Sequence, residues 1–361
     1  MMDALVVGGG PAGAAAAITL ARAGASVTLV EREARAREKV CGEFLGPDAA
    51  QALARLGLSL ADLGAAPIGR ARLAAGPRDA GWNLPFQAWS IPRAPLDEAL
   101  LSLASEAGAT VLRGRAVAAA GRDGRGWMAR LSDGGVLHAP ALVLATGKHE
   151  LRGHARPGRR GAVGLKLPLR LATPLEGAVL LLPFAGGYAG LQPRPDGGAN
   201  LCAALWQAGD EARHPAALLA RVSAGSALAA SWLRGAEPAW PRPLTVARIP
   251  YGFLHRDGAA AEPGLYRVGD QFAVIPSLAG DGVAMALAGG EAAAQAILAG
   301  RSAPHFHAAL GERLHRPMRW AGLIAYGLEA APAALAFAAG LAPGLARLAA
   351  SRTRLPGFTP A

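Results

Sequence analysis

The sequence predicts an α/β protein with one domain built on a parallel sheet, a second domain built on an antiparallel sheet, and a helical C-terminus. Three observations predict this class. The chain opens with two short apolar runs separated by a glycine-rich turn and a small-residue stretch, the order of a strand, a helix and a second strand. Between residues 177 and 206, β-rich runs alternate with tight turns, as in antiparallel sheets. Residues 320–341 form an apolar stretch of helical length.

The opening segment has the spacing of a dinucleotide-binding turn. The run Asp3–Val7 suits a buried parallel strand, and Gly8, Gly10 and Gly13 follow it in the pattern G-x-G-x-x-G. Gly8 allows a tight turn, Gly10 lets a pyrophosphate approach the backbone, and Gly13 lets the helix pack on the sheet. Glu31 ends the second strand 18 residues after Gly13 (31 − 13), where an acid binds a ribose hydroxyl. These residues predict a Rossmann-type domain that binds a dinucleotide.

The composition limits the classes of partner. Of 361 residues, 52% are hydrophobic and 17% are charged, which is enough apolar surface for one large or two ordinary domains. The net charge of +11 does not predict nucleic-acid binding, because the arginines are scattered rather than gathered in a basic run with aromatic residues. It suits a phosphate-bearing cofactor or an anionic membrane surface. Cys41 and Cys202 predict neither a disulfide framework nor a metal site, and His305 and His307 are expected at the surface.

A second motif, K-x-C-G-E at Lys39–Glu43, follows a charged loop that begins at Arg32. Together with the glycine turn and its acid, it resembles the geranylgeranyl reductase-like branch of the FAD-dependent oxidoreductases. These are relatives of the p-hydroxybenzoate hydroxylase-like enzymes in the group A flavin monooxygenase superfamily. In the family this loop lies beside the flavin, so Cys41 and Glu43 are the candidate catalytic residues. Cys41 would donate a proton or only pack, and Glu43 would act as an acid or clamp the loop.

Later segments resemble the family's other cofactor contacts. Arg93 begins a helix and would reach the flavin cofactor, unless it is a solvated N-terminal arginine. Val117 would bind the adenine through its backbone, and the run Ala145–Gly147 would return the chain to the FAD. The cofactor-binding positions that the resemblance implies are Gly8, Gly10, Pro11, Ala12, Gly13, Glu31, Arg32, Lys39, Cys41, Arg93, Val117, Ala145, Thr146, Gly147, Gly269, Asp270, Pro276, Gly280, Asp281, Gly282 and Val283.

The second FAD motif of the family is matched by Gly269-Asp270, followed by Pro276 and a glycine-rich turn into a helix. Asp270 would accept a hydrogen bond from a ribityl hydroxyl. The N–H groups around Gly280–Val283 would face the flavin edge that gains negative charge on reduction, where fixed donors stabilise the reduced form. Gln271 stands where the family usually has a small residue.

The order of elements predicts three parts. They are a discontinuous FAD-binding domain (1–68, 93–150 and 262–310), a substrate domain (69–92 and 151–261) and a C-terminal helical segment (311–361). The family places its substrate cavity between the antiparallel sheet and the flavin. The candidate substrate contacts are Phe184, Tyr188, Leu191 and Trp206, and the alternative is that these side chains form sheet core.

The C-terminal segment is unusually apolar. Residues 320–341 contain one charged side chain, Glu329, and have about the length of a membrane span. Pro332 and Pro343 argue against a continuous span, so we expect an amphipathic helical pair that covers the protein or rests on a bilayer as a peripheral contact. The expected location is cytoplasmic, with membrane association at the inner face through this segment.

The resemblance implies an FAD-dependent oxidoreductase. Because the chain has no second G-x-G-x-x-G, NAD(P)H or a protein donor would reach the flavin from outside. A monooxygenase that hydroxylates a hydrophobic aromatic, polyketide or quinone-like substrate is expected ahead of a reductase of prenyl or other activated C=C bonds. A flavin-binding redox sensor or partner protein without turnover is the alternative from another class. The expected partner is a hydrophobic small molecule.

Overall fold

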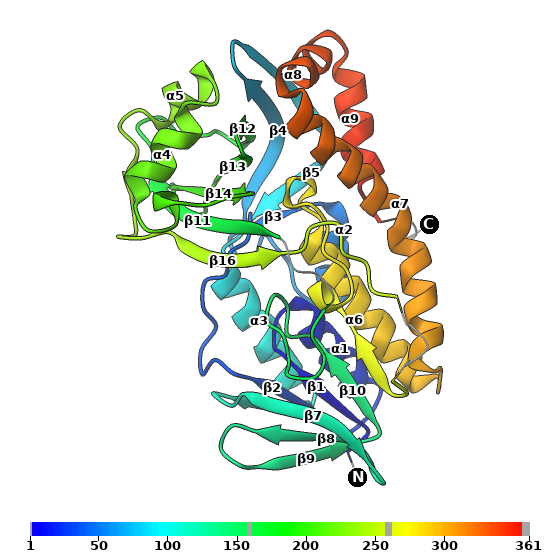
Figure 1. The fold of residues 1–361 in the computed structure, drawn as a ribbon. Helices are drawn as coiled ribbons and strands as arrows, with labels where there is room; N and C mark the ends of the chain where they lie inside the picture. Colours follow the sequence, from blue (N-terminus) through cyan, green and yellow to red (C-terminus); the bar gives the residue numbers. More distant parts are fainter. Residues whose placement is uncertain (1, 157–160, 257–261, 356–361) are drawn as a thin grey trace.

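The computed structural model describes residues 2–156, 161–256 and 262–355. A parallel sheet lies at one end of the molecule (Figure 1). Its strands run in the order β17 (Leu265–Arg267), β10 (Ala141–Leu144), β1 (Ala4–Val7), β2 (Val27–Glu31) and β6 (Thr110–Arg113). Helices α1 (Pro11–Arg22), α3 (Arg93–Glu106) and α6 (Gly282–Leu298) cover one face. The hairpin strands β7 (Val117–Asp123), β8 (Gly126–Leu131) and β9 (Val136–Ala139) cover the other. The predicted α/β class is confirmed.

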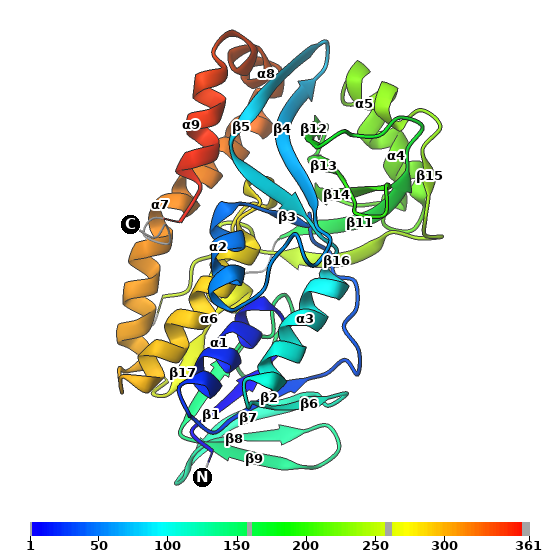
Figure 2. The same cartoon turned by 180° about the vertical axis from the view of Figure 1, so that it is seen from behind.

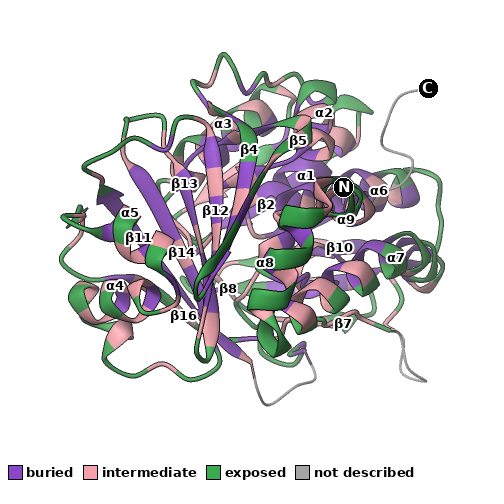
Figure 3. Ribbon diagram, turned by 90° about the horizontal axis from the view of Figure 1, so that it is seen from above, coloured by how far each residue is buried: buried purple, intermediate pink, exposed green. Residues whose placement is uncertain are grey.

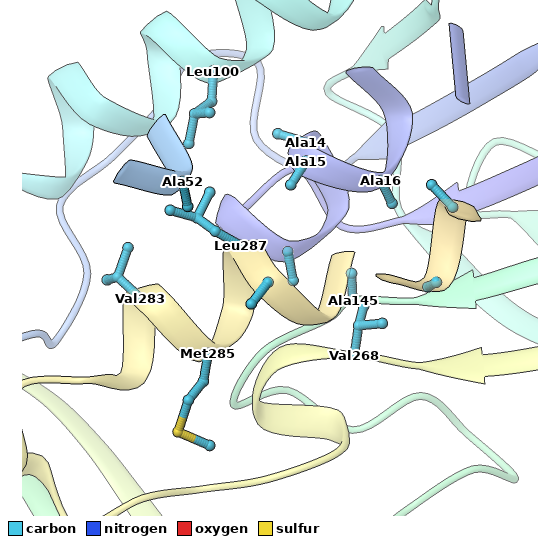
Figure 4. Close-up of a cluster of buried hydrophobic side chains, with 14 of the residues drawn as sticks. Ala14, Ala15, Ala16, Ala52, Leu100, Ala145, Val268, Val283, Met285 and Leu287 are labelled. Atoms are coloured by element: carbon cyan, nitrogen blue, oxygen red, sulfur yellow. The ribbon is translucent and has the colours of Figure 1, made fainter. Parts of the chain in front are cut away.

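Small residues let α1 and α6 lie in direct contact. Ala14–Ala16 of α1 are fully buried in the same cluster as Leu287 of α6 (Figure 4). A Cβ atom added to Gly290 of α6 would lie 2.1 Å from the carbonyl oxygen of Ala12, so only glycine allows this approach. The contact fixes the N-terminal ends of the two helices relative to each other. The short helix α2 (Pro47–Arg55) packs on the other side of α6.

A larger, mainly antiparallel sheet stands above the parallel one (Figure 1). Its strands run in the order β15 (Glu237–Pro238), β11 (Ala162–Arg170), β14 (Ala199–Leu205), β13 (Gly187–Pro193), β12 (Ala178–Phe184), β4 (Ala66–Ala75), β5 (Arg78–Ser90) and β3 (Phe44–Leu45). Strand β16 (Leu244–Ile249) also pairs with β11. Helices α4 (Pro215–Ser223) and α5 (Ala227–Leu233) cover the outer face. The inner face is left for the cavity described below.

Three helices form the C-terminal end and run along one side of both sheets (Figures 1 and 2). They are α7 (Ala303–Ala330), α8 (Pro332–Leu341) and α9 (Pro343–Arg352), and α8 and α9 contact β5. Among the described residues, no single helix is long and apolar enough to cross a bilayer. Helices α7 and α8 taken together are long and apolar enough for a span, but the chain bends by 113° between them. Proline at the first position of each of α8 and α9 starts the new helix direction.

One histidine expectation is wrong. His307 lies on α7 but is buried, and its Nε2 accepts a hydrogen bond from the backbone N–H of Arg267 at 2.9 Å. Its ring stacks on Phe272, with 5.5 Å between ring centroids. The reason is that α7 packs along β17 instead of projecting into solvent, so one face of the helix is inside the molecule. His305 is exposed, as expected.

Candidate functional site

The two predicted glycine motifs line a single cavity of about 640 Å³. Its lower wall comes from the turn at Gly10–Ala12 and from the start of α6 at Gly280, Gly282 and Val283. These segments are more than 260 residues apart in the chain (280 − 12 = 268) and meet because α1 and α6 are packed against each other. Two helix N-termini therefore open on the same space, which favours an anionic, phosphate-bearing ligand.

The glycine turn has the close contacts that the motif requires. Gly8 has a φ of +107°, and a Cβ atom there would lie 2.4 Å from the carbonyl oxygen of Ala145. A Cβ on Gly13 would lie 1.9 Å from the carbonyl oxygen of Gly8. A Cβ on Gly10, by contrast, would lie 3.6 Å from the Nη2 of Arg93, an ordinary contact distance, so the backbone is open toward the cavity. This cradle fits a pyrophosphate, as the spacing predicted.

Charged side chains hold the rim of this cradle in place. Arg93 lines the cavity at the start of α3 and makes two hydrogen bonds of 2.9 Å to Asp97. Burial is the largest single influence on the pKa of Arg93 and would lower it, but Asp97 and Cys41 together outweigh burial and raise the pKa, so the guanidinium stays charged. Glu31 is buried at the end of β2 and accepts a hydrogen bond of 2.7 Å from the N–H of Gly9. Arg93 is therefore fixed in the cavity wall and is not a solvent-exposed arginine at the N-terminus of a helix.

Two side chains tie the second motif to the segment after β10, and the sequence predicted a role for neither. Lys148 forms an ion pair of 3.1 Å with Asp270. Gln271 is buried and its Nε2 donates to the carbonyl oxygens of Gly147 at 2.8 Å and His149 at 3.0 Å. The unusual glutamine thus bridges the two cofactor segments. Lys148 could have been found, because it directly follows the predicted run Ala145–Gly147.

The K-x-C-G-E loop is clamped from the antiparallel sheet. Glu43 is buried at a φ of 65°, a conformation that side-chain-bearing residues rarely adopt. Its carboxylate contacts the Nζ of Lys166, which is fully buried on β11. Asn200 donates to the carbonyl oxygens of Cys41 and Gly42, both at 3.2 Å. Burial raises the pKa of Glu43, while Lys166 opposes the shift. Of the two roles considered for Glu43, these contacts favour holding the loop in place over acting as a catalytic acid. They also hold Cys41 in the cavity wall.

The residues after α9 fasten the C-terminal helices to the second motif. Arg354 pairs with the buried carboxylate of Asp281 and donates to the carbonyl oxygen of Ala279 at 3.0 Å. Leu355 donates its backbone N–H to Asp48 at 2.9 Å. Burial raises the pKa of Asp281 to about 7, with Arg354 opposing the shift. The side chain of Asp281 is therefore held by Arg354, which lines the cavity together with Gly280 and Gly282, whereas Asp281 itself does not line it.

The burial of Asp281 beside Arg354 predicts that the free energy of unfolding depends on pH. The folded protein holds a proton on Asp281 up to about pH 7, whereas the unfolded chain releases it near the ordinary pKa of 3.8. Because the folded state binds more protons between these values, the free energy of unfolding contributed by Asp281 falls as the pH rises through that window. Asp281→Asn should therefore flatten the pH profile of the free energy of unfolding between pH 4 and 7. Parallel profiles from denaturant titrations of the two proteins would contradict this.

The structure brings most of the predicted cofactor positions to the cavity. Those that line it are Gly10, Pro11, Ala12, Cys41, Arg93, Ala145, Gly147, Gly269, Asp270, Gly280, Gly282 and Val283. The remaining positions do not line it: Gly8, Gly13, Glu31, Arg32, Lys39, Val117, Thr146, Pro276 and Asp281. Arg32 contacts His149 at 2.8 Å, and Val117 begins β7. The contacts of these outer residues with a cofactor stay predictions.

Of the predicted substrate contacts, only Tyr188 lines the cavity. Leu191 is fully buried, and it and Phe184 pack in the core under α4 and α5, because alternate residues of a strand point to opposite faces. On β13, residues 188, 190 and 192 face the cavity, while Leu191 faces the helices. Trp206 is 36% exposed and touches the Tyr188 ring edge-on, outside the cavity lining. The expectation for Phe184, Leu191 and Trp206 is therefore corrected.

Three hydroxyl groups meet on the cavity wall next to the second motif. The hydroxyl of Tyr188 lies 2.6 Å from the Oγ of Ser277, and Tyr251 donates to the same Oγ at 3.0 Å. All three residues line the cavity. Burial raises the pKa of Tyr188 to about 12 and that of Tyr251 well above its usual range. Both tyrosines therefore keep their protons at neutral pH. Neither Tyr251 nor Ser277 is predicted by the sequence: Tyr251 lies outside any motif, and Ser277 lies inside the second motif at a position to which the pattern gives no role.

Away from the glycine motifs, the cavity becomes apolar. The sheet contributes Leu73, Trp82, Leu84 and Leu181. The C-terminal helices contribute Trp320, Ile324, Leu328, Leu335, Leu345 and Leu348. The spacing 320, 324, 328 places one stripe of α7 on this wall. The C-terminal helices are thus part of the site.

Comparisons with known proteins agree with this geometry. Residues 1–150 match the family model described as the FAD binding domain. The menaquinone reductase of Mycolicibacterium smegmatis is 29% identical over 328 residues, which are 82% of this chain and 76% of that protein. The flavin-dependent brominase Bmp2 has a TM-score of 0.79 at 19% identity, with 99% of this chain and 96% of that chain covered. A geranylgeranyl bacteriochlorophyll reductase-like protein from Thermoplasma acidophilum has a TM-score of 0.75 at 19% identity, covering 99% and 93%. The two structures show a shared fold.

Proposed function

Because this chain is an FAD-dependent oxidoreductase with the group A flavoprotein fold, we propose that it reduces a carbon–carbon double bond in the isoprenoid tail of a quinone-like lipid. The observation that carries this proposal is the apolar part of the cavity, lined by the sheet residues and the C-terminal helices named above. It extends from the glycine motifs to α7–α9. A hydrocarbon tail would bury its surface there. The similarity to a menaquinone reductase supports the same substrate class. This places reduction ahead of hydroxylation, the reverse of the order that the sequence suggested.

The reaction needs an electron pair and a proton. FAD held by the glycine motifs would supply the hydride, and an external donor such as NAD(P)H would supply its electrons. When one alkene carbon receives hydride, the other must receive a proton, so that C=C becomes CH–CH and the donor leaves as NAD(P)⁺. Tyr251 and Tyr188 hold protons on the cavity wall, and Ser277 links their hydroxyls. A tyrosine that gives up its proton would regain one through this link, which makes the cluster a general acid.

Mass spectrometry of the product tests the proposal. Purified holoenzyme is incubated with NADPH and a quinone that carries a short prenyl tail, with and without oxygen. A product that gains two hydrogen atoms under anaerobic conditions is the expected result. A product that gains one oxygen atom, formed only in air, would establish the hydroxylase in its place. NADPH oxidation that no substrate stimulates would favour a flavoprotein without turnover.

Tyr251→Phe is expected to slow product formation by roughly 10²-fold, the usual contribution of a positioned general acid. The ring and its packing remain, so FAD absorbance should be unchanged. Tyr326→Phe is the matched control, because Tyr326 lies on α7 with 72% of its surface exposed and outside the cavity lining. Single-turnover rates of the two variants measure the difference. Equal rates would exclude the Tyr251 hydroxyl as the proton donor.

Cys41→Ala is expected to keep FAD bound and to slow turnover. Cys41 lines the cavity, and its Sγ accepts a hydrogen bond of 3.3 Å from the N–H of Glu43, so the thiol faces the reacting space while the loop is held by other contacts. FAD content and steady-state rate are measured on the same preparation. Unchanged turnover would remove Cys41 from the mechanism.

A further inference from the structure

Large apolar side chains remain exposed on the C-terminal helices. On α7, Leu323 and Tyr326 are 61% and 72% exposed, and on α8, Phe337 and Leu341 are 48% and 70% exposed. None of these four lines the cavity. Figure 3 shows much of α8 as exposed surface. A helix on the surface of a soluble domain normally turns a polar face outward, whereas every exposed residue of α8 is apolar.

The inner side of the same helices is also apolar, because it forms the far wall of the cavity. Trp320, Ile324 and Leu328 line the cavity from α7, about one turn apart. Tyr326 lies on the opposite side of the helix, and Leu323 lies between the two sides. On α9, Leu345 and Leu348 line the cavity and are still 60% and 46% exposed. The cavity wall and the exposed apolar surface therefore belong to one continuous layer that is one helix thick.

Exposed arginines outnumber carboxylates around this layer, in which Glu329 is exposed near the end of α7. Arg316 and Arg319 are exposed on α7 just before Leu323, and Arg347 is exposed on α9. Arg78, at the start of β5, places its guanidinium 5.0 Å from the ring of Phe337. An apolar centre with a basic rim matches the acyl region and the anionic headgroups of a bilayer. A second copy of this chain would bring like charges together, since the net charge is +11.

We propose that α7–α9 dock on an anionic bilayer and that the lipid substrate enters the cavity between them, directly from the membrane. The second half of this inference rests on the proposed function. The docking itself rests only on the surface.

The test is sedimentation of the holoprotein with vesicles of phosphatidylcholine, with or without phosphatidylglycerol. Wild-type protein should bind the anionic vesicles and be released by salt, because the rim charges are screened. A variant with both Leu323→Asp and Leu341→Asp should bind at least tenfold more weakly with its FAD content unchanged. Val136→Asp is the matched control, since Val136 is 47% exposed on β9, at the other end of the molecule (Figure 1). If the double variant loses FAD, Leu341→Asp alone replaces it.

Absence of wild-type binding, or equal binding by the double variant, would overturn the docking surface. A dimer that the double variant dissociates, without vesicle binding, would assign the surface to a second copy. Turnover measured with two substrates distinguishes failure of the docking proposal from failure of the proposed reductase activity. With a short, water-soluble prenyl quinone, the double variant should match wild type, and with substrate embedded in vesicles it should be at least tenfold slower. Vesicle binding without turnover on either substrate would leave the docking surface standing and refute the reductase.

Discussion

Replacing Gly13 by alanine is expected to abolish FAD binding and to lower the melting temperature. The added Cβ would lie 1.9 Å from the carbonyl oxygen of Gly8 and 3.1 Å from a methyl group of Val6. Neither neighbour can move easily, because Gly8 is the turn residue between β1 and α1 and Val6 is fully buried in the parallel sheet. The helix must therefore shift away from the sheet, at a cost of roughly 3 kcal/mol or more for overpacking rigid backbone. The shift would also displace the N-terminus of α1 from the phosphates.

The measurements are the flavin absorbance of the purified protein, an FAD titration and thermal unfolding. Gly121→Ala is the matched control, since a Cβ at Gly121 meets nothing within 4 Å and the residue has no positive φ. This control should bind FAD normally and unfold close to wild type. Normal FAD binding by Gly13→Ala would show that the turn is not the phosphate cradle.

Lys166→Met is expected to have the largest effect on stability outside the glycine turn. Lys166 is fully buried and contacts the carboxylates of Glu38 and Glu43. Removing the cation leaves the buried Glu43 without its main partner, and breaking one side of such a pair costs about 3–5 kcal/mol. The methionine side chain has a similar shape, so the loss is electrostatic rather than a loss of packing. Chemical denaturation measures the free energy of unfolding.

A double variant isolates the cause. Adding Glu43→Gln to Lys166→Met removes the charge that the lysine neutralised, so much of the lost stability should return. A coupling near zero in this double-mutant cycle would contradict the clamp. The same variants report on the K-x-C-G-E loop, because loss of the clamp should loosen Cys41 and slow turnover even where FAD still binds.

The cofactor side of the site could be predicted from local patterns. Gly8, Gly10, Gly13 and Glu31 lie within one strand–helix–strand unit, where spacing along the chain fixes position in space. The clamp on Glu43 could not be found in this way. Its partner Lys166 comes 123 residues later and belongs to no motif.

The residues on the substrate side of the cavity could not be predicted from the sequence, for a different reason. Strand β13 is covered by α4 and α5 on one face and borders the cavity on the other, so both faces carry apolar residues. Alternation therefore could not tell Tyr188, which lines the cavity, from Leu191, which does not. The hydroxyl cluster was also hidden, because Tyr188, Tyr251 and Ser277 belong to three separate segments.

The sequence by itself determined the parallel-sheet domain, its glycine turns and the cofactor class, because these depend on backbone geometry within short segments. Only the tertiary structure decided which side chains share the cavity and which charges are buried together. Asp281 and Arg354 illustrate the reason. They are 73 residues apart, and only the packing of the C-terminal helices brings Arg354 to the fully buried Asp281.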